Sequence, residues 1–565
     1  MKRHLCFLSL FAAAFAHADV KLPAVFTDHL VLQRGKPVAV WGTADAAEEI
    51  TVSFADQSKK ATAGKDGSWK ASLDKLEASA EPRELKVKGK NEIVLKDVLV
   101  GEVWICSGQS NMQWTVSASL NSQQEIAAAT FGNIRLFSVP RVPEDAPQKD
   151  IKQPQPWQVC SPETVGGFSA VGYFFGRELH KTLNVPIGLI NTSWGGTRAE
   201  AWTSKPALEA VPTCKAIITS WEEFLKTYDV AQAKAQHEAA ANLQKEKIAK
   251  IKEENAKPGA TQQPVPQGMR AFEDQTKSQH RPAVFFNGMI APLVPYAVKG
   301  AIWYQGESNQ RRAVQYQTLL PTMIKDWRKQ WGDDFSFYTV QLAGFGNGRT
   351  WPQPVGAEDT WAELQWAQFL TATKPKFNAG IAIANDIGEE RDIHPKNKQE
   401  VGRRLALQAL VKDYGKKDIL SGGPIFAGGT TEGARIVVNF SNGSGLKARD
   451  GGDLKGFIIC GEDKVWKPAK AKVFAGRPQV HVWNDEIKAP IAARYAWAAW
   501  SPEANLVNKD GLPAGCFRTD KFDLSTKGVE NPFNENAPAP AAPAKTNDSK
   551  AAPKKAAQAP AKKAA

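Results

Sequence analysis

The stretch that points to the fold is Val103-Trp104-Ile105-Cys106-Ser107-Gly108-Gln109-Ser110-Asn111-Met112. It begins with an apolar run typical of a buried β-strand and continues into a glycine-containing turn that carries Ser110. In open α/β folds, ligands bind at the edge of the sheet where such strands end. The turn therefore either exposes the Ser110 hydroxyl for attack on a carbonyl carbon or is an ordinary strand-to-helix turn.

Apolar runs of the same kind recur along the chain, with helical patterns between them. The further strand-like runs are residues 187–190, 300–303 and 381–384, and the helical stretches include residues 171–183 and 399–411. Alternation of strand and helix is typical of a parallel α/β sheet. We therefore predict an α/β domain over residues 101–420.

Both flanks of this domain have β character. Residues 19–100 show period-two alternation, as in Ile50-Thr51-Val52-Ser53-Phe54, with glycine and aspartate turns between the runs. This pattern predicts a small N-terminal β-sandwich. Similar alternation returns after about residue 420, so we expect a second β-rich portion over residues 421–530.

Two segments have compositions that set them apart. Residues 221–279 are charged and rich in Ala, Gln and Lys, which indicates an insertion within the α/β domain. Its helical half is either a solvated helix or a partner-binding coiled coil. Residues 537–565 are Ala/Pro/Lys repeats that cannot bury enough apolar surface to fold. We expect a disordered basic tail, with tethering to a cell surface or polyanion as the alternative.

The N-terminus has the pattern of a signal peptide. A basic start, a short apolar run and Ala16-His17-Ala18 predict cleavage after residue 18, and hence a secreted or periplasmic protein. The mature chain would keep five cysteines, too few for a disulfide framework, although one or two bridges can form. No later run of eighteen apolar residues occurs, so we expect a soluble protein without a membrane span.

Composition and missing motifs exclude several classes. With 42% apolar and 23% charged residues, the chain is neither wholly disordered nor a polytopic membrane protein. Much of its +13 charge lies at the two ends, so the body is only modestly basic and we expect no nucleic-acid partner. The sequence contains no phosphate-binding P-loop, no dinucleotide glycine fingerprint and no zinc motif.

A serine nucleophile needs a base to take its proton. Of the eight histidines, only His180 and His394 lie in the predicted α/β body. His180 falls in a helical stretch, whereas His394 lies in a loop after a strand, as Ser110 does. Asp392 could hold the imidazole in the required tautomer. The alternative is that Asp392-Ile393-His394-Pro395 is a helix-entry turn capped by the aspartate.

Acyl transfer also needs donors for the developing oxyanion. Residues 191–198 follow one predicted strand, and Gly195 and Gly196 let backbone N–H groups approach closely. Gln305-Gly306-Glu307-Ser308-Asn309 follows another strand and supplies a side-chain amide. Four separate loops after strands thus carry different parts of one mechanism.

Taken together, these loops resemble the sialate O-acetylesterase family of the SGNH/GDSL hydrolase superfamily. The similarity rests, in chain order, on Gly108-Gln109-Ser110-Asn111-Met112, Trp194-Gly195-Gly196-Thr197, Trp303-Tyr304-Gln305-Gly306-Glu307-Ser308-Asn309 and Asp392-Ile393-His394-Pro395. Further matching stretches, among them Asn397-Lys398-Gln399, extend it from about residue 22 to residue 520, with the charged insertion omitted.

The resemblance implies a three-layer α/β/α SGNH hydrolase with a parallel sheet, flanked by β-sandwich-like portions. Such enzymes remove O-acetyl groups from sugars without a metal or organic cofactor. By the same resemblance Ser110 would be the nucleophile, His394 the general base and then the general acid, and Asp392 the residue that orients it.

The resemblance also implies an oxyanion hole. It would combine the N–H of Ser110, a glycine N–H from Gly195 or Gly196, and a side-chain amide. The wider superfamily presents an asparagine in a Gly-x-Asn-Asp context, whereas this chain has Gln305 in the corresponding block. We expect Gln305 to supply the amide, with Asn309 as the alternative.

The substrate is less closely defined by the sequence. The substrate-binding candidates are Gln109, Asn111, Trp194, Arg198, Trp202 and Glu307. Eighteen tryptophans suit stacking on sugar rings but are equally good core material. Arg198 with Glu200 either lines the sugar site or forms a buried ion pair.

The expected partner is an acetylated sugar or polysaccharide. The main prediction is a sialate O-acetylesterase, and the closest alternative is an acetylxylan or xyloglucan esterase of the same family. Two further alternatives are a non-catalytic glycan-binding relic and a lipase or thioesterase. Retention of the serine, histidine, aspartate and oxyanion candidates together argues against the relic.

Overall fold

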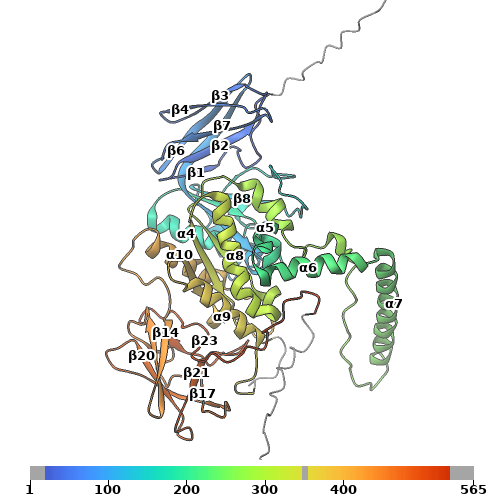
Figure 1. The fold of residues 1–565 in the computed structure, drawn as a ribbon, viewed down its shortest axis with the longest axis vertical. Helices are drawn as coiled ribbons and strands as arrows, with labels where there is room; N and C mark the ends of the chain where they lie inside the picture. The colour runs from blue at the N-terminus through green and yellow to red at the C-terminus, as the bar shows by residue number, and fades with distance from the viewer. Residues whose placement is uncertain (1–18, 347–353, 535–565) are drawn as a thin grey trace, which may run out of the picture.

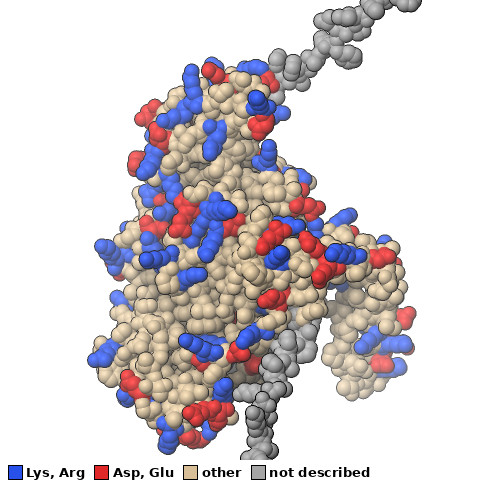
Figure 2. All heavy atoms as spheres, in the orientation of Figure 1, with Lys and Arg blue, Asp and Glu red and all other residues tan. Residues whose placement is uncertain are grey.

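The computed structural model describes residues 19–346 and 354–534. The predicted signal peptide (1–18) and the Ala/Pro/Lys tail (537–565) lie outside the described residues. Within the described part, no helix is both long and apolar enough to cross a membrane. Figure 2 shows Lys and Arg interspersed with Asp and Glu over the face drawn.

A parallel sheet forms the centre of the molecule (Figure 1). Its strand order is β13-β12-β11-β7-β10-β8, all paired in parallel, and β9 adds a short antiparallel edge to β8. The bounds are β7 (Glu92–Gly108), β8 (Ile134–Ser138), β9 (Gln158–Val159), β10 (Ile187–Asn191), β11 (Gly300–Tyr304), β12 (Ser336–Gln341) and β13 (Ala379–Ile383). The strands predicted at residues 187–190, 300–303 and 381–384 are therefore confirmed as β10, β11 and β13.

Helices cover both faces of this sheet, because successive residues of a strand point to opposite sides. Trp104 of β7 packs on Phe175 and Tyr338, on the side of α4 (Ala170–Leu183) and α10 (Lys398–Lys412). On the other side, Trp303 of β11 packs on Trp327 of α8 (Ala313–Trp331), with α9 (Thr360–Ala372) beside it. The result is the three-layer α/β/α fold that the family resemblance implied, built on the parallel α/β pattern predicted from the sequence.

Strand β7 joins this sheet to the N-terminal β portion. Its first half pairs antiparallel with β6 and its second half is the central parallel strand, so the predicted boundary at residue 100 falls inside one continuous strand. The other N-terminal strands are β1 (Val31–Gln33), β2 (Val38–Thr43), β3 (Glu49–Phe54), β4 (Gln57–Thr62), β5 (Ser68–Leu73) and β6 (Ser79–Lys88).

The remaining helices are short or peripheral. They are α1 (Ser110–Gln113), α2 (Ser122–Ala127), α3 (Pro162–Val165), α5 (Lys205–Glu209), α6 (Pro212–Thr227) and α7 (Val230–Asn255). Helix α7 lies within the charged segment and has no buried residue. In Figure 1 it stands apart from the body of the molecule, to which α6 connects it.

The C-terminal portion is built from small antiparallel sheets with a hydrophobic core of their own. One sheet has the order β14-β15-β20-β19, another β18-β17-β21-β23, and β16 pairs with β22. The bounds are β14 (Ile425–Glu432), β15 (Arg435–Ser441), β16 (Lys447–Ala448), β17 (Phe457–Cys460), β18 (Trp466–Pro468), β19 (Lys470–Val473), β20 (Gln479–Trp483), β21 (Ala492–Tyr495), β22 (Leu506–Val507) and β23 (Phe517–Arg518). The five described cysteines are all buried and unpaired.

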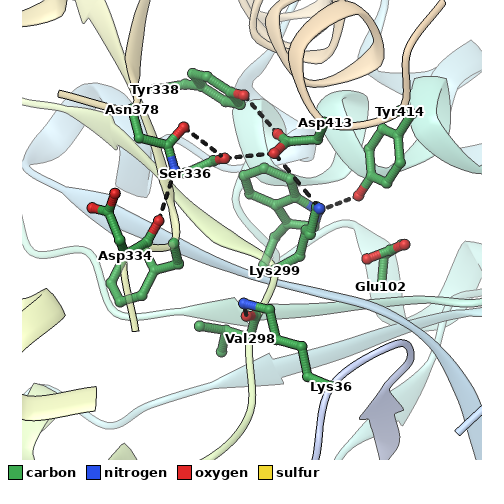
Figure 3. Close-up of polar contacts among 12 residues, drawn as sticks. Lys36, Glu102, Val298, Lys299, Asp334, Ser336, Tyr338, Asn378, Asp413 and Tyr414 are labelled. Atoms are coloured by element: carbon green, nitrogen blue, oxygen red, sulfur yellow. Dashed lines mark hydrogen bonds and ion pairs between the residues drawn. The ribbon is translucent and has the colours of Figure 1, made fainter. Parts of the chain in front are cut away.

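Polar side chains gather at the amino-terminal edge of the parallel sheet (Figure 3). Asp413, which follows α10, accepts hydrogen bonds from Ser336 Oγ (2.5 Å) and Tyr338 Oη (2.6 Å), both on β12. Lys299, just before β11, lies 3.7 Å from the same carboxylate. Lys36, from the N-terminal portion, donates to the carbonyl of Val298 (2.9 Å), which ties that portion to the sheet.

Candidate active site

The predicted functional loops meet at the opposite, carboxyl edge of the sheet. Helix α1 starts at Ser110 directly after β7, and residues 192–198 follow β10. Gln305 follows β11, and the loop with Asp392 and His394 lies between β13 and α10. Because these strands are parallel, their carboxyl ends lie together, and the four loops form one site.

A glycine is required where β7 turns into α1. Gly108 has φ +137°, and a Cβ at this position would lie 2.2 Å from the carbonyl oxygen of Tyr304 on the neighbouring strand. The N–H of Gln109 donates to the same carbonyl at 3.0 Å. The turn therefore packs closely against β11. Ser110 is half-buried at the first position of α1, while Asn111 and Met112 are buried.

Ser110 and His394 are in direct contact. His394 Nε2 lies 2.9 Å from Ser110 Oγ, so a neutral imidazole can accept the hydroxyl proton. The imidazole stacks on the indole of Trp114, with ring centroids 5.0 Å apart and an interplanar angle of 14°. Stacking and the serine contact together define the orientation of the ring.

Asp392 holds the loop rather than bonding the ring directly. Its Oδ1 accepts the backbone N–H of His394 at 2.9 Å and lies 3.6 Å from Nδ1 of the imidazole. The first distance is a hydrogen bond, and the second is an ionic contact that is too long for one. The carboxylate is therefore placed to stabilise an imidazolium electrostatically, and it also caps the turn, as the alternative interpretation of this loop predicted.

The environment of His394 favours its neutral form. Burial, followed by the charge of Lys398, lowers the pKa of the imidazole, and Asp392 opposes that shift. Desolvation disfavours the charged form because water no longer solvates it. The imidazole is thus kept ready to accept a proton.

The glycine loop after β10 lies against the serine. A Cβ on Gly195 would meet Ser110 Cβ at 3.2 Å, which is tighter than an ordinary van der Waals contact, so glycine favours this close approach. Gly196 has φ +71° and is exposed, whereas the N–H of Gly195 donates to Gln113 Oε1 at 2.6 Å. Among the described residues, the N–H groups of Ser110 and Gly196 have no hydrogen-bond acceptor.

Gln305 is fully buried, and both donors of its amide are already used. Its Nε2 donates to the carbonyl of Thr197 (3.1 Å) and to Asn309 Oδ1 (2.6 Å), and its Oε1 accepts from Tyr316 Oη (2.8 Å). Asn309 Nδ2 in turn donates to Glu200 Oε2 at 2.8 Å. Both amide hydrogens of Gln305 are thus engaged away from Ser110, and Asn309 Nδ2 uses one hydrogen on Glu200.

Glu200 belongs to a buried ion pair. It bonds the guanidinium of Arg312, and both side chains are fully buried. The nearby charges of Arg312 and Arg198 hold the pKa of Glu200 low, against the effect of its burial. The alternative of a buried pair, rather than a sugar contact, therefore describes Glu200, with Arg312 as the directly bonded partner.

Several substrate-binding candidates lie behind the serine instead of beside an open surface. Trp202 is fully buried and packs on Phe285 and Trp303, so it belongs to the core. Gln109, 3% exposed, accepts the N–H groups of Gly306 and Ser308, both at 3.3 Å. Because Trp202 and Gln109 are buried, neither side chain can contact a sugar directly. The candidates that remain partly exposed are Trp194 and Arg198.

Asn111 and Glu307 are also buried, and the structure adds a residue that the sequence analysis did not assign to the site. Asn111 Nδ2 donates to Glu307 Oε1 at 2.6 Å, and Lys398 Nζ donates to Asn111 Oδ1 at 2.6 Å. Lys398 is the first residue of α10 and is fully buried. The signal for it was the matching stretch Asn397-Lys398-Gln399, but a lysine at a helix start is ordinarily a solvated residue.

The described residues contain no group of three or more His, Cys, Asp or Glu side chains arranged to hold a metal ion. The chemistry available at the site is that of a serine hydroxyl beside a half-buried imidazole. Acyl transfer also requires donors for the oxyanion, and the N–H groups of Ser110 and Gly196, which have no acceptor among the described residues, lie in the serine turn and the adjoining glycine loop.

The comparisons with known proteins agree with this chemistry. The profile of a family described as carbohydrate esterase, sialic acid-specific acetylesterase matches residues 100–253. Sialate O-acetylesterase of Mus musculus is 28% identical over 515 residues, covering 84% of this chain and 89% of that protein. The Homo sapiens sialate O-acetylesterase is 28% identical over 535 residues, covering 88% of this chain and 91% of that protein.

A solved structure extends the similarity to three dimensions. A carbohydrate acetylesterase from Xanthomonas citri is 34% identical, with a TM-score of 0.73, and the match covers 89% of this chain and 100% of that one. Identity and coverage at this level show common descent along nearly the whole chain. The chain therefore belongs to the sialate O-acetylesterase family of carbohydrate esterases, which are hydrolases of carboxylic esters.

Proposed function

We propose that the protein removes O-acetyl groups from sugars through a covalent acetyl-enzyme formed on Ser110. The observation that carries this proposal is the 2.9 Å contact between Ser110 Oγ and His394 Nε2 at the carboxyl edge of the sheet. A hydroxyl in contact with a neutral imidazole is an activated nucleophile, and membership in an acetylesterase family supplies the reaction class.

The reaction proceeds in two steps. Ser110 Oγ attacks the acetyl carbonyl while His394 Nε2 takes its proton, and the imidazolium then protonates the departing sugar oxygen. Water then attacks the acetyl carbon of the acetyl-enzyme while the imidazole takes its proton. The bond between Ser110 Oγ and the acetyl group breaks, the imidazolium returns the proton to Oγ, and acetate leaves. Asp392 stabilises the imidazolium in both steps from its position 3.6 Å from Nδ1.

The oxyanion receives two backbone hydrogen bonds in this proposal. The N–H groups of Ser110 and Gly196 supply them, because both lack an acceptor among the described residues. Gln305 contributes indirectly, since its two amide hydrogens hold Thr197 and Asn309. This assignment replaces the sequence-based expectation of a direct bond from Gln305 or Asn309.

The proposed substrate is an acetylated sugar, with O-acetyl sialic acid as the first candidate. Relatives bearing the name sialate O-acetylesterase match along most of their length, and the Xanthomonas citri relative is described as a carbohydrate acetylesterase. Trp194 and Arg198 flank the glycine loop and remain partly exposed. They provide an apolar face for a sugar ring and a cation for a carboxylate.

We also propose that the protein is exported. The basic start, apolar run and Ala16-His17-Ala18 support removal of residues 1–18, and the mature chain would act outside the cytoplasm. N-terminal sequencing of protein recovered from the medium or periplasm tests this. A first residue of Asp19 is expected, and an intact Met1 on the exported protein contradicts the proposal.

Acetate release decides the function. The protein is incubated with O-acetylated sialic acid, acetylated xylan, acetylated xyloglucan and pectin, with Ser110→Ala in parallel. We expect release from at least one glycan and its loss in the variant. Release that persists in Ser110→Ala contradicts the nucleophile, and binding without release supports the glycan-binding relic. A chain-length series of fatty-acyl esters tests the lipase alternative.

A further inference from the structure

The residues on either side of His394, Ile393 and Pro395, both have their backbone carbonyl hydrogen-bonded by a buried side chain. Asn111 Nδ2 donates to the carbonyl of Ile393 at 3.0 Å, on one side of the histidine. Lys398 Nζ donates to the carbonyl of Pro395 at 2.6 Å, on the other side. The backbone is therefore fixed by a side-chain hydrogen bond on each side of His394.

These two side chains belong to one cluster. Lys398 Nζ also donates to Asn111 Oδ1 (2.6 Å), and Asn111 Nδ2 also donates to Glu307 Oε1 (2.6 Å). We call Asn111, Glu307 and Lys398 the clamp. Its members come from three separate elements: Asn111 from α1 beside the serine, Glu307 from the loop after β11, and Lys398 from the start of α10.

The clamp is buried, so water does not compete for its hydrogen bonds. Lys398 is 0% exposed, Asn111 1% and Glu307 7%. The ammonium lies 5.6 Å from the ring of Trp114 and 5.7 Å from that of Tyr304, which exclude solvent around it. A buried ammonium is costly unless its donors are satisfied, so its hydrogen bonds strongly specify the surrounding arrangement.

We propose that Asn111, Glu307 and Lys398 are positioning residues that hold the His394 loop so that the imidazole reaches Ser110. Asn111 is adjacent to the serine in sequence and bonds the histidine loop in space, so one side chain couples the two reacting groups. This inference rests on the proposed roles of Ser110 and His394, and it gives Asn111 and Glu307 a positioning role in place of substrate contact.

The clamp has a second effect, which is electrostatic. The groups that act on His394 are Asp392, which favours the imidazolium, and Lys398, which opposes it. Glu307, Asp392 and Glu389 act in turn on Lys398, whose pKa burial lowers to about 7. Below that pH the ammonium is charged and disfavours a second positive charge on the imidazole. Loss of the lysine should therefore raise the pKa of His394.

Lys398→Met is the central test, because methionine keeps an unbranched chain and removes the donors. We expect kcat for an acetyl ester to fall about 10- to 100-fold with KM changed by less than about twofold, since the altered interaction acts on the reacting groups. The acid limb of the pH profile of kcat/KM should move to higher pH. Lys412→Met is the matched control. Lys412 is the last residue of the same helix, and its ammonium donates to the carbonyl of Ala379 (2.8 Å), at the opposite end of α10 from Lys398.

Variants of Glu307 provide a second test in case the Lys398→Met protein does not fold. In Glu307→Gln, the glutamine keeps an oxygen that can accept from Asn111 Nδ2, so we expect kcat to stay within about threefold of the parent. Glu307→Leu removes that acceptor and should lower kcat about tenfold. Equal activity of the Gln and Leu variants overturns the role of Glu307.

An NMR titration of the His394 imidazole, performed in the Ser110→Ala background, measures the clamp without catalysis. The expected result is a higher imidazole pKa when Lys398→Met is added. An unchanged pKa together with normal kcat in the folded Lys398→Met protein overturns the proposal, even if its melting temperature falls. Acetate release that survives in Ser110→Ala instead refutes the proposed function, so the two failures are distinguishable.

Discussion

Both edges of the parallel sheet carry polar residues, but the contacts of these residues differ. At the amino edge, Asp413 takes hydrogen bonds from Ser336 and Tyr338 and lies beside Lys299, so the polar groups satisfy one another (Figure 3). At the carboxyl edge, Ser110 meets His394, and the N–H groups of Ser110 and Gly196 lack an acceptor within the described residues.

One sheet thus separates residues that stabilise the fold from residues that can react. Polar groups that are all hydrogen-bonded to one another hold the strands and helices together, and none of them is available to react with a substrate. Reactive groups need partners that change during the reaction, so the edge that carries them keeps donors free. Behind that edge, the clamp residues hydrogen-bond to one another and to the His394 loop, much as the residues of the amino edge bond to one another. The exception is Glu307 Oε2, which is buried without a partner among the described residues.

Removal of the reacting groups should break the comparison most strongly. We expect Ser110→Ala and His394→Ala each to lower kcat by about 10⁴-fold or more, with the melting temperature nearly unchanged. The double variant should be no worse than either single one, because the two residues act as a unit. Steady-state kinetics and thermal melts of all three proteins check this, and additive losses contradict it.

Gln305→Ala separates a direct oxyanion donor from a supporting residue. Because both amide hydrogens are engaged elsewhere, we expect kcat to fall only about tenfold, with a loss of stability of about 1–3 kcal/mol from the broken network. A direct donor would cost on the order of 10²–10³ in kcat. A loss in that larger range, without a loss of stability, returns the oxyanion role to Gln305.

The pH dependence should report the environment of His394. The imidazole acts as a base only when neutral, so kcat/KM should rise with pH through its titration and fall as the pH drops. Because burial and Lys398 lower the pKa of His394, the midpoint should lie below about 6.5. A midpoint above 7 shows instead that Asp392 dominates, and a flat profile from pH 5 to 8 contradicts His394 as the base.

Asp413→Ala should leave activity almost untouched. The change deprives Ser336 and Tyr338 of their acceptor, so we expect the free energy of unfolding to fall by about 1–3 kcal/mol. Turnover should stay within about twofold of the parent, since the carboxylate lies at the edge opposite Ser110. Denaturation curves and kinetics on the same samples test this. A loss of turnover without a loss of stability would contradict it, because it would show that the amino edge contributes to the reaction.

Local sequence patterns predicted the frame of the molecule well. The helices expected at residues 171–183 and 399–411 are α4 and α10, and the predicted buried runs form parallel strands. Periodicity succeeds here because each element buries one apolar face or a continuous apolar run. The same reasoning could not separate surface tryptophans from core ones. Trp194 is partly exposed and Trp202 is fully buried, although both follow the same strand.

The fold class, the order of the loops that follow the strands and the residue types in those loops were predictable from the sequence alone, because they depend on local patterning and on the parallel topology. Which donors remain available depends on the tertiary contacts: Gln305 donates to Thr197 and Asn309, whereas the N–H groups of Ser110 and Gly196 have no acceptor within residues 19–346 and 354–534. The tertiary structure also decided that Lys398 is buried against Asn111. Hydrogen bonds between residues far apart in sequence depend on distances that no local pattern encodes.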